Sequence, residues 1–174
     1  MINLDQNISF IWRNKDKETP LKTLVKLRDF CKNNNRKFYI SNNIKLATNI
    51  NADGVYISSS NRNLNLKYIS LKNKFKIIGS AHNLKEIKLK ELQNIKEIFL
   101  SPIFKDKTNK RLSIYRYLKL QKATFMKDIS LGGINEKNVK KLKLIKPHGF
   151  AGISFFDKKK APKKGPFKFI KNNN

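Results

Sequence analysis

Residues 75–100, FKIIGSAHNLKEIKLKELQNIKEIFL, contain two strand-like runs with a helix-like segment between them. The runs Phe75–Ile78 and Ile98–Leu100 are rich in the β-branched and aromatic residues that favour strands. The segment Asn83–Ile95 repeats apolar residues at helical spacing, and Asn83 is of a type that caps helix N-termini. This stretch therefore predicts one strand–helix–strand unit.

The same alternation extends over the rest of the chain. Further strand-like runs are Ile8–Trp12, Lys37–Ile40, Gly54–Ile57, Phe125–Leu131 and Gly149–Phe155, and further helix-like segments are Leu21–Lys32 and Asn138–Ile145, the last with Asn135 as a plausible N-cap. Strands that alternate with helices predict a parallel sheet. Seven such strands favour a TIM-type (β/α) barrel. An open doubly wound sheet is the alternative, although no Gly-x-Gly-x-x-Gly follows any strand to indicate a dinucleotide fold.

The composition limits the class of protein. The formal net charge is +27, from 39 basic and 12 acidic residues, and such a charge attracts polyanions and phosphorylated metabolites. Because the lysines are scattered, we expect nucleic-acid binding only as non-specific attraction. The single cysteine, Cys31, excludes an internal disulfide and argues against a cysteine-based zinc site. No apolar run approaches the roughly 18 residues of a membrane span, and no secretory signal is evident, so we expect a cytoplasmic protein.

In a parallel barrel, functional residues lie at the C-terminal ends of the strands. Those positions are rich in hydroxyls, amides and cations, which donate hydrogen bonds and charge to anions: Arg13, Lys15, Asn42, Asn61, Ser80, His82, Ser101, Thr108, Lys110 and Ser154. The pair Gly132–Gly133 precedes the last helix-like segment, where the backbone and a helix N-terminus could hold a phosphate. A tight turn is the alternative reading of this pair.

Five blocks in order carry a family resemblance: Ala52–Tyr56 (ADGVY), Ser80–His82 (SAH), Leu100–Phe104 (LSPIF), Leu131–Asn135 (LGGIN) and Gly149–Ser154 (GFAGIS). Their order and spacing resemble the thiamine phosphate synthases and the related thiazole tautomerases (TenI-like), which are (β/α)8 barrels. The resemblance runs from about Ile8 to Phe156. It implies a transferase that joins hydroxymethylpyrimidine diphosphate to thiazole phosphate, with release of diphosphate and use of Mg²⁺.

The resemblance also implies roles for individual residues. Arg13 and Lys15 would hold the pyrimidine diphosphate, and Gly132, Gly133 and Ser154 the thiazole phosphate. Asn42, Asn61, Ser101, Thr108 and Lys110 are further candidate substrate- or phosphate-binding residues, and Ser80 and His82 match the family's Ser-x-His. We interpret Ser80 and His82 as candidate catalytic residues, with His82 as an acid or base. A helix-start histidine bonded to the backbone is the alternative for His82.

The metal half of the site departs from the family. Asn42 and Asn61 stand where the family has its Mg²⁺-binding aspartates, and Mg²⁺ prefers charged oxygen ligands. Either Asp106 substitutes as a metal ligand, or Lys and Arg neutralise the diphosphate, or the synthase reaction is gone. The third case would leave a tautomerase-like enzyme or a non-catalytic barrel that binds a phosphorylated ligand.

The chain is expected to divide into a barrel domain, 1–156, and a basic tail, 157–174. Compared with the family, we expect the first strand and helix to be missing, which would leave an open barrel with unpaired edges. We expect the tail, through Phe167, Phe169 and Ile170, or a second subunit in a homodimer to cover this gap.

Overall fold

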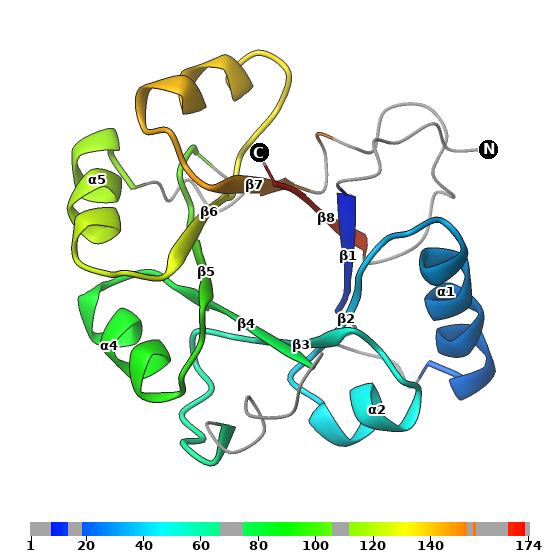
Figure 1. Cartoon of the computed structure of the whole chain (residues 1–174). Helices are drawn as coiled ribbons and strands as arrows, with labels where there is room; N and C mark the ends of the chain where they lie inside the picture. Colours follow the sequence, from blue (N-terminus) through cyan, green and yellow to red (C-terminus); the bar gives the residue numbers. More distant parts are fainter. Residues whose placement is uncertain are drawn as a thin grey trace.

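The computed structural model describes residues 8–13, 19–66, 75–105, 112–152, 155 and 167–172. Its strands form one closed barrel in the order of the sequence (Figure 1). They are β1 (Ile8–Trp12), β2 (Phe38–Ser41), β3 (Gly54–Ile57), β4 (Lys76–Ala81), β5 (Glu97–Leu100), β6 (Lys127–Leu131), β7 (Gly149–Gly152) and β8 (Phe167–Asn172). From β1 to β7, each strand is parallel to the next. The predicted TIM-type barrel with seven parallel strands is therefore confirmed.

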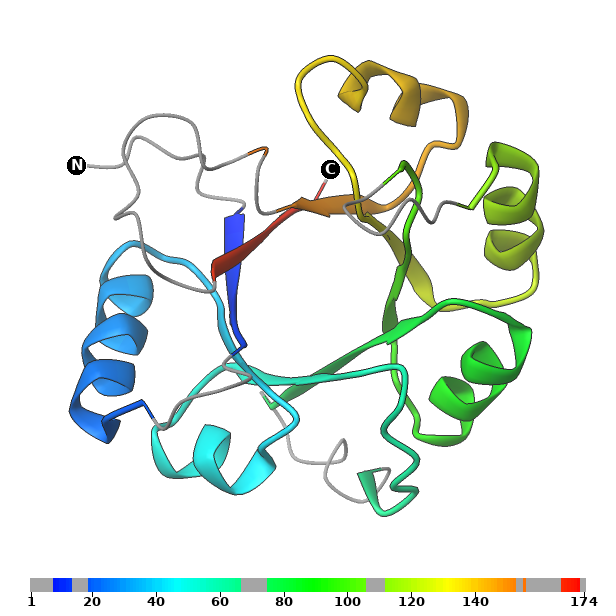
Figure 2. The same ribbon diagram turned by 180° about the vertical axis from the view of Figure 1, so that it is seen from behind.

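Helices surround the barrel on the outside (Figure 2). They are α1 (Leu21–Asn33), α2 (Ile44–Asn49), α4 (Leu84–Leu92), α5 (Ile114–Lys122) and the 3₁₀ helix η1 (Val139–Leu144). The predicted cap Asn83 is confirmed, because its side-chain oxygen accepts a hydrogen bond from the backbone N–H of Glu86 at 3.0 Å. Among these described helices, none is both long and apolar enough to cross a membrane.

The predicted cap Asn135 makes the hydrogen bonds of a helix cap, although the regular helix starts later. Its Oδ1 accepts hydrogen bonds from the backbone N–H groups of Lys137 and Asn138, at 2.9 and 3.2 Å, and its carbonyl oxygen accepts from the N–H of Val139 at 2.9 Å. The regular element begins at Val139, and it is a 3₁₀ helix. A turn over residues 136–138 lies between Gly132–Gly133 and this helix, so the regular helix does not start directly after the two glycines.

Alternation along the strands divides the core into an inner and an outer part. One residue of each parallel strand fills the barrel interior, and these are Ile11, Tyr39, Tyr56, Ile78, Phe99, Ile129 and Ala151. The residues between them, such as Phe38, Ile57 and Leu100, face outward and pack beneath the helices. Because side chains alternate, Ser80 of β4 points to the same side as Ile78, toward the barrel axis. Arg13 and Ser101 directly follow β1 and β5 at the same end of the barrel.

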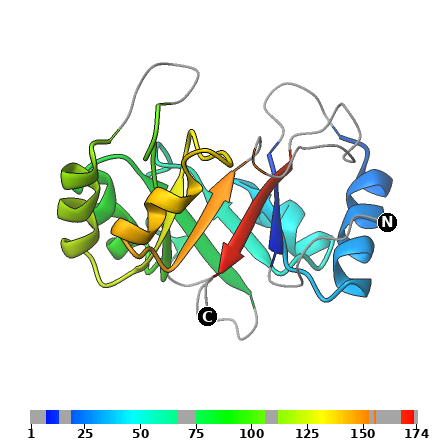
Figure 3. The same cartoon turned by 90° about the horizontal axis from the view of Figure 1, so that it is seen from above.

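The strand β8 closes the barrel between β7 and β1, as the views in Figures 1 and 3 both show. It is antiparallel to both neighbours, with Phe169 opposite Phe10 and Ile170 opposite Ala151. Closure gives β1 and β7 pairing partners on both sides. The expectation that the tail covers the gap is therefore confirmed for 167–172. The homodimer and the domain boundary at 156 stay predictions.

Candidate functional site

The candidate site is the mouth of the barrel, which we define as the C-terminal ends of β1 to β7 and the residues that follow them. Eight of the predicted site residues lie there in the described part of the chain: Arg13, Asn42, Asn61, Ser80, His82, Ser101, Gly132 and Gly133. Five others, Lys15, Asp106, Thr108, Lys110 and Ser154, lie outside the described residues.

Tyr56, on β3, brings together two of the predicted residues. The hydroxyl of this buried tyrosine forms a hydrogen bond with the Ser80 side chain. The tyrosine also interacts electrostatically with the guanidinium group of Arg13. Burial raises the pKa of Tyr56, whereas the Ser80 bond and Arg13 lower it by less. The phenol therefore stays protonated at neutral pH and can donate a hydrogen bond. The sequence analysis missed Tyr56 because a tyrosine within a strand resembles an ordinary core residue. Alternation along the strand, which places Tyr56 on the same inward face as Gly54 and Ser58, is the signal that could have found it.

His82, which follows β4, is hydrogen-bonded to Ser101, which follows β5. Its ring Nδ1 lies 2.7 Å from the carbonyl oxygen of Ser101 and 3.2 Å from the Ser101 hydroxyl, and its backbone N–H donates to the carboxylate of Glu86 at 2.6 Å. A carbonyl only accepts, so the neutral ring carries its proton on Nδ1, which leaves Nε2 as an acceptor. These contacts match the helix-start interpretation of His82. The acid or base role stays a prediction.

Gly132 and Gly133 form a turn that packs against the residues after β5. Both have positive φ, +98° and +67°. A Cβ on Gly132 would lie 2.7 Å from the Pro102 Cβ, and one on Gly133 would lie 2.6 Å from the carbonyl oxygen of Lys105. The backbone N–H of Phe104 donates to the carbonyl of Gly132 at 3.1 Å. We call these two glycines the glycine cradle, because only glycine fits this conformation and this close approach.

The side chain of Asn138 holds the glycine cradle from the other side. Its Nδ2 donates to the carbonyl oxygen of Gly133 at 2.7 Å, and its Oδ1 accepts from the backbone N–H of Asn135 at 2.8 Å. The cradle is therefore fixed by backbone and amide contacts on both sides. A rigid turn of this kind can approach a phosphate closely with its backbone.

The residues at the family's metal positions do not fit Mg²⁺. The Asn42 side-chain oxygen accepts from the backbone N–H of Ser58 at 2.8 Å, and that of Asn61 accepts from Asn63 at 2.9 Å. Both oxygens are neutral and already accept hydrogen bonds, whereas Mg²⁺ prefers charged oxygen ligands. The described residues also contain no cluster of three or more His, Cys, Asp or Glu that could hold a metal. Asp106 lies outside the described residues.

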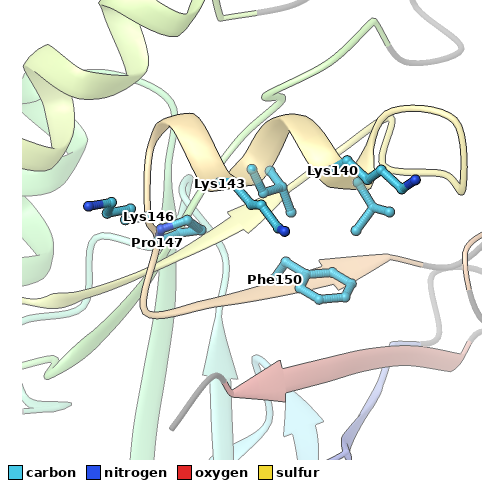
Figure 4. Close-up of a pocket in the computed structure, with 7 residues that line it drawn as sticks. Lys140, Lys143, Lys146, Pro147 and Phe150 are labelled. Carbon is cyan, nitrogen blue, oxygen red and sulfur yellow. The ribbon is translucent and has the colours of Figure 1, made fainter.

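Two pockets lie away from the mouth. One, of about 620 Å³, lies between η1 and the outer face of β7, with Lys140, Lys143 and Lys146 around Phe150 (Figure 4). The other, of about 640 Å³, lies at the opposite end of the barrel beside the C-terminus of α1, where Arg28 and Lys37 are part of its lining. Neither pocket includes a predicted site residue.

Comparison with known proteins identifies relatives of this barrel. The chain is 30% identical to the thiamine-phosphate synthase of Fusobacterium nucleatum subsp. nucleatum, over 88% of this chain and 76% of the relative. It is 32% identical to the thiamine-phosphate synthase of Pelagibacter ubique, over 86% of this chain and 74% of the relative. The solved thiamine phosphate pyrophosphorylase of Pyrococcus furiosus superposes with a TM-score of 0.61 at 16% identity, over 74% of this chain and 65% of that chain, which supports the fold.

The family resemblance noted in the sequence is thus also found by comparison over about three quarters of the length of these two relatives. A family model described as thiamine monophosphate synthase matches residues 6–156, which include the parallel strands β1 to β7 and every part of the mouth. The chain therefore belongs to the thiamine monophosphate synthase family.

Proposed function

We propose that the chain is a thiamine phosphate synthase-type transferase, which condenses hydroxymethylpyrimidine diphosphate with thiazole phosphate to give thiamine phosphate and diphosphate. Family membership and the named relatives support this reaction class. The observation that carries the proposal is that the mouth holds a cation with two hydroxyls, Arg13, Tyr56 and Ser80, together with the glycine cradle. The two groups suit two phosphorylated substrates.

The proposed roles follow from charge. The thiazole ring nitrogen forms a bond to the methylene carbon of the pyrimidine, and the bond between that carbon and the diphosphate breaks, so negative charge increases on the departing diphosphate. The guanidinium of Arg13 would stabilise that charge, and the hydroxyls of Tyr56 and Ser80 would donate hydrogen bonds to its oxygens. The glycine cradle would hold the phosphate of the thiazole so that its ring faces the methylene group.

No step is assigned to a metal ion, because the described donors do not fit one. We propose instead that basic side chains neutralise the diphosphate in this chain. The expected reaction therefore continues in the presence of EDTA.

The test is a thiamine phosphate formation assay with both substrates, with Mg²⁺ or with EDTA. Arg13→Ala is compared with Arg116→Ala, which removes an exposed arginine of α5 on the outside of the barrel. Product formation by the wild type and Arg116→Ala, with a loss of at least about 100-fold in Arg13→Ala, supports the proposal. No product from the wild type refutes the synthase. If thiazole phosphate then still raises Tm, a tautomerase-like or binding role remains.

A further inference from the structure

Two polar residues, Lys90 of α4 and Gln93 at the C-cap of this helix, are completely buried, each with 0% of its surface exposed. The neighbouring Lys88 on the same helix instead lies at the surface and pairs with Glu91 at 2.8 Å. An ammonium group excluded from water is costly unless it is hydrogen-bonded. A lysine and a glutamine inside the layer between helix and barrel therefore need specific partners.

Those partners belong to one segment, the residues that follow β3. The Lys90 ammonium donates to the carbonyl oxygen of Asn61 at 2.9 Å and to the side-chain oxygen of Gln93 at 3.0 Å. The Gln93 amide donates to the carbonyl oxygens of Asn61 and Asn63, both at 3.0 Å. Three of these four bonds thus end on the backbone of a segment about thirty residues earlier in the chain.

The same segment is also held at its start. The backbone N–H of Ser58 donates to the Asn42 side chain at 2.8 Å, and the hydroxyls of Ser58 and Ser60 lie 3.2 Å apart. We call residues 58–63 the β3 segment. It is anchored to β2's end on one side and to α4 on the other, and it borders the mouth with amide and hydroxyl groups.

An apolar pair would fill the space under α4 without the cost of burying a charge. The presence of two buried polar residues here is therefore better explained by their hydrogen bonds to the β3 segment than by the filling of space. A loop that carried a metal ligand could be ordered by the ion, but Asn42 and Asn61 do not form such a site. The buried pair supplies that order from within the fold, and a segment that is already ordered loses less entropy when a ligand binds.

We propose that Lys90 and Gln93 are positioning residues that fix the β3 segment, and with it Asn61, in the geometry that receives the diphosphate of the substrate. They act through the backbone of Asn61 and touch no substrate. The identity of the substrate in this inference rests on the proposed function. The positioning of the β3 segment rests on the hydrogen bonds alone.

The first test compares Lys90→Met with the matched control Lys88→Met, which makes the same change two residues away at the surface. KM and kcat are measured for the pyrimidine diphosphate with each folded variant. We expect Lys90→Met to raise KM roughly tenfold with kcat within about twofold, and Lys88→Met to change neither. A purely structural role would lower kcat through loss of folded enzyme and leave KM unchanged, and an unchanged KM overturns the inference. If Lys90→Met does not fold, Gln93→Met replaces it, with the same expectation.

A second readout separates this inference from the proposed function. Amide hydrogen exchange of the β3 segment is followed in the wild type and both lysine variants without any substrate. We expect exchange in residues 58–63 to be at least about tenfold faster in Lys90→Met than in Lys88→Met, with the exchange of β5 unchanged. Equal exchange in all three proteins overturns the positioning role even if the wild type is active. An inactive wild type with the expected exchange difference refutes only the synthase.

Discussion

Substitution of Gly133 by alanine should damage both stability and the site. Gly133 has a φ of +67°, and a left-handed backbone costs an L-residue about 1–2 kcal/mol. The new Cβ would lie 2.6 Å from the carbonyl oxygen of Lys105 and 2.7 Å from that of Phe104. Both contacts are with backbone, which cannot rotate away, and overpacking of this kind costs about 1–3 kcal/mol. The free energy of unfolding should therefore fall by about 3 kcal/mol.

The measurement is thermal and urea unfolding of Gly133→Ala beside Gly152→Ala. In Gly152 the new Cβ would lie 3.4 Å from the nearest heavy atom, the Cβ of Phe155, and φ is not positive. This control should unfold within about 1 kcal/mol of the wild type. For a chain of this size, a loss of about 3 kcal/mol lowers Tm by roughly 10 °C. The reasoning would be refuted if the two variants were equally stable, because the cradle would then tolerate a side chain.

Three further predictions concern other parts of the molecule. Burial raises the pKa of Cys31 from 9.0 to about 12, so the protonated thiol stabilises the fold below pH 9 and this contribution is lost as pH rises from 9 to 12. The stability advantage of the wild type over Cys31→Ala should shrink by about 2 kcal/mol between pH 8.5 and 10.5 in urea unfolding, and a constant difference would contradict this. Tyr117→Phe should lower the free energy of unfolding by about 2 kcal/mol, because the buried Tyr117 hydroxyl donates to Asp128 and accepts from Ser130, each at 2.8 Å. An unchanged urea midpoint would show that Asp128 and Ser130 form other hydrogen bonds in the variant. Deletion of 157–174 should expose the edges of β1 and β7 and produce oligomers in analytical ultracentrifugation, whereas a stable monomer would show that β8 is dispensable.

The sequence predicts the strands better than the helices. The strands are short runs in which β-branched, aromatic or other apolar residues predominate, and all seven predicted parallel strands form. The helix α2 was not predicted because six residues are too few for helical periodicity to appear. The helix α5 was also missed, since its buried Tyr117 and Leu120 lie among lysines and an arginine. Ser113, whose side chain accepts from the backbone N–H of Arg116 at 3.2 Å, is the signal that could have located it.

The location of the mouth residues also follows from alternation, but their contacts do not. Arg13 and Ser80 lie two residues beyond inward-facing core residues, so the sequence can place them at the mouth. Tyr56 resembles an ordinary core residue in the sequence, and only the barrel brings it to Ser80. Lys90 resembles a solvated helix residue for the same reason: its partner Asn61 approaches only after α4 has packed on β4 and β4 has paired with β3.

The direction of the closing strand has a cause in the sequence that precedes it. A parallel strand after β7 would need a crossover connection, usually a helix, to return the chain to the other end of the barrel. Residues 153–166, ISFFDKKKAPKKGP, contain a lysine-rich run and two prolines, and they lack helical periodicity. An antiparallel strand starts at the end of the barrel where β7 stops, so it needs no helix in the connection. The pattern of Phe167, Phe169 and Ile170 indicates that a strand follows, and the nature of the connection makes the antiparallel direction of β8 the accessible one.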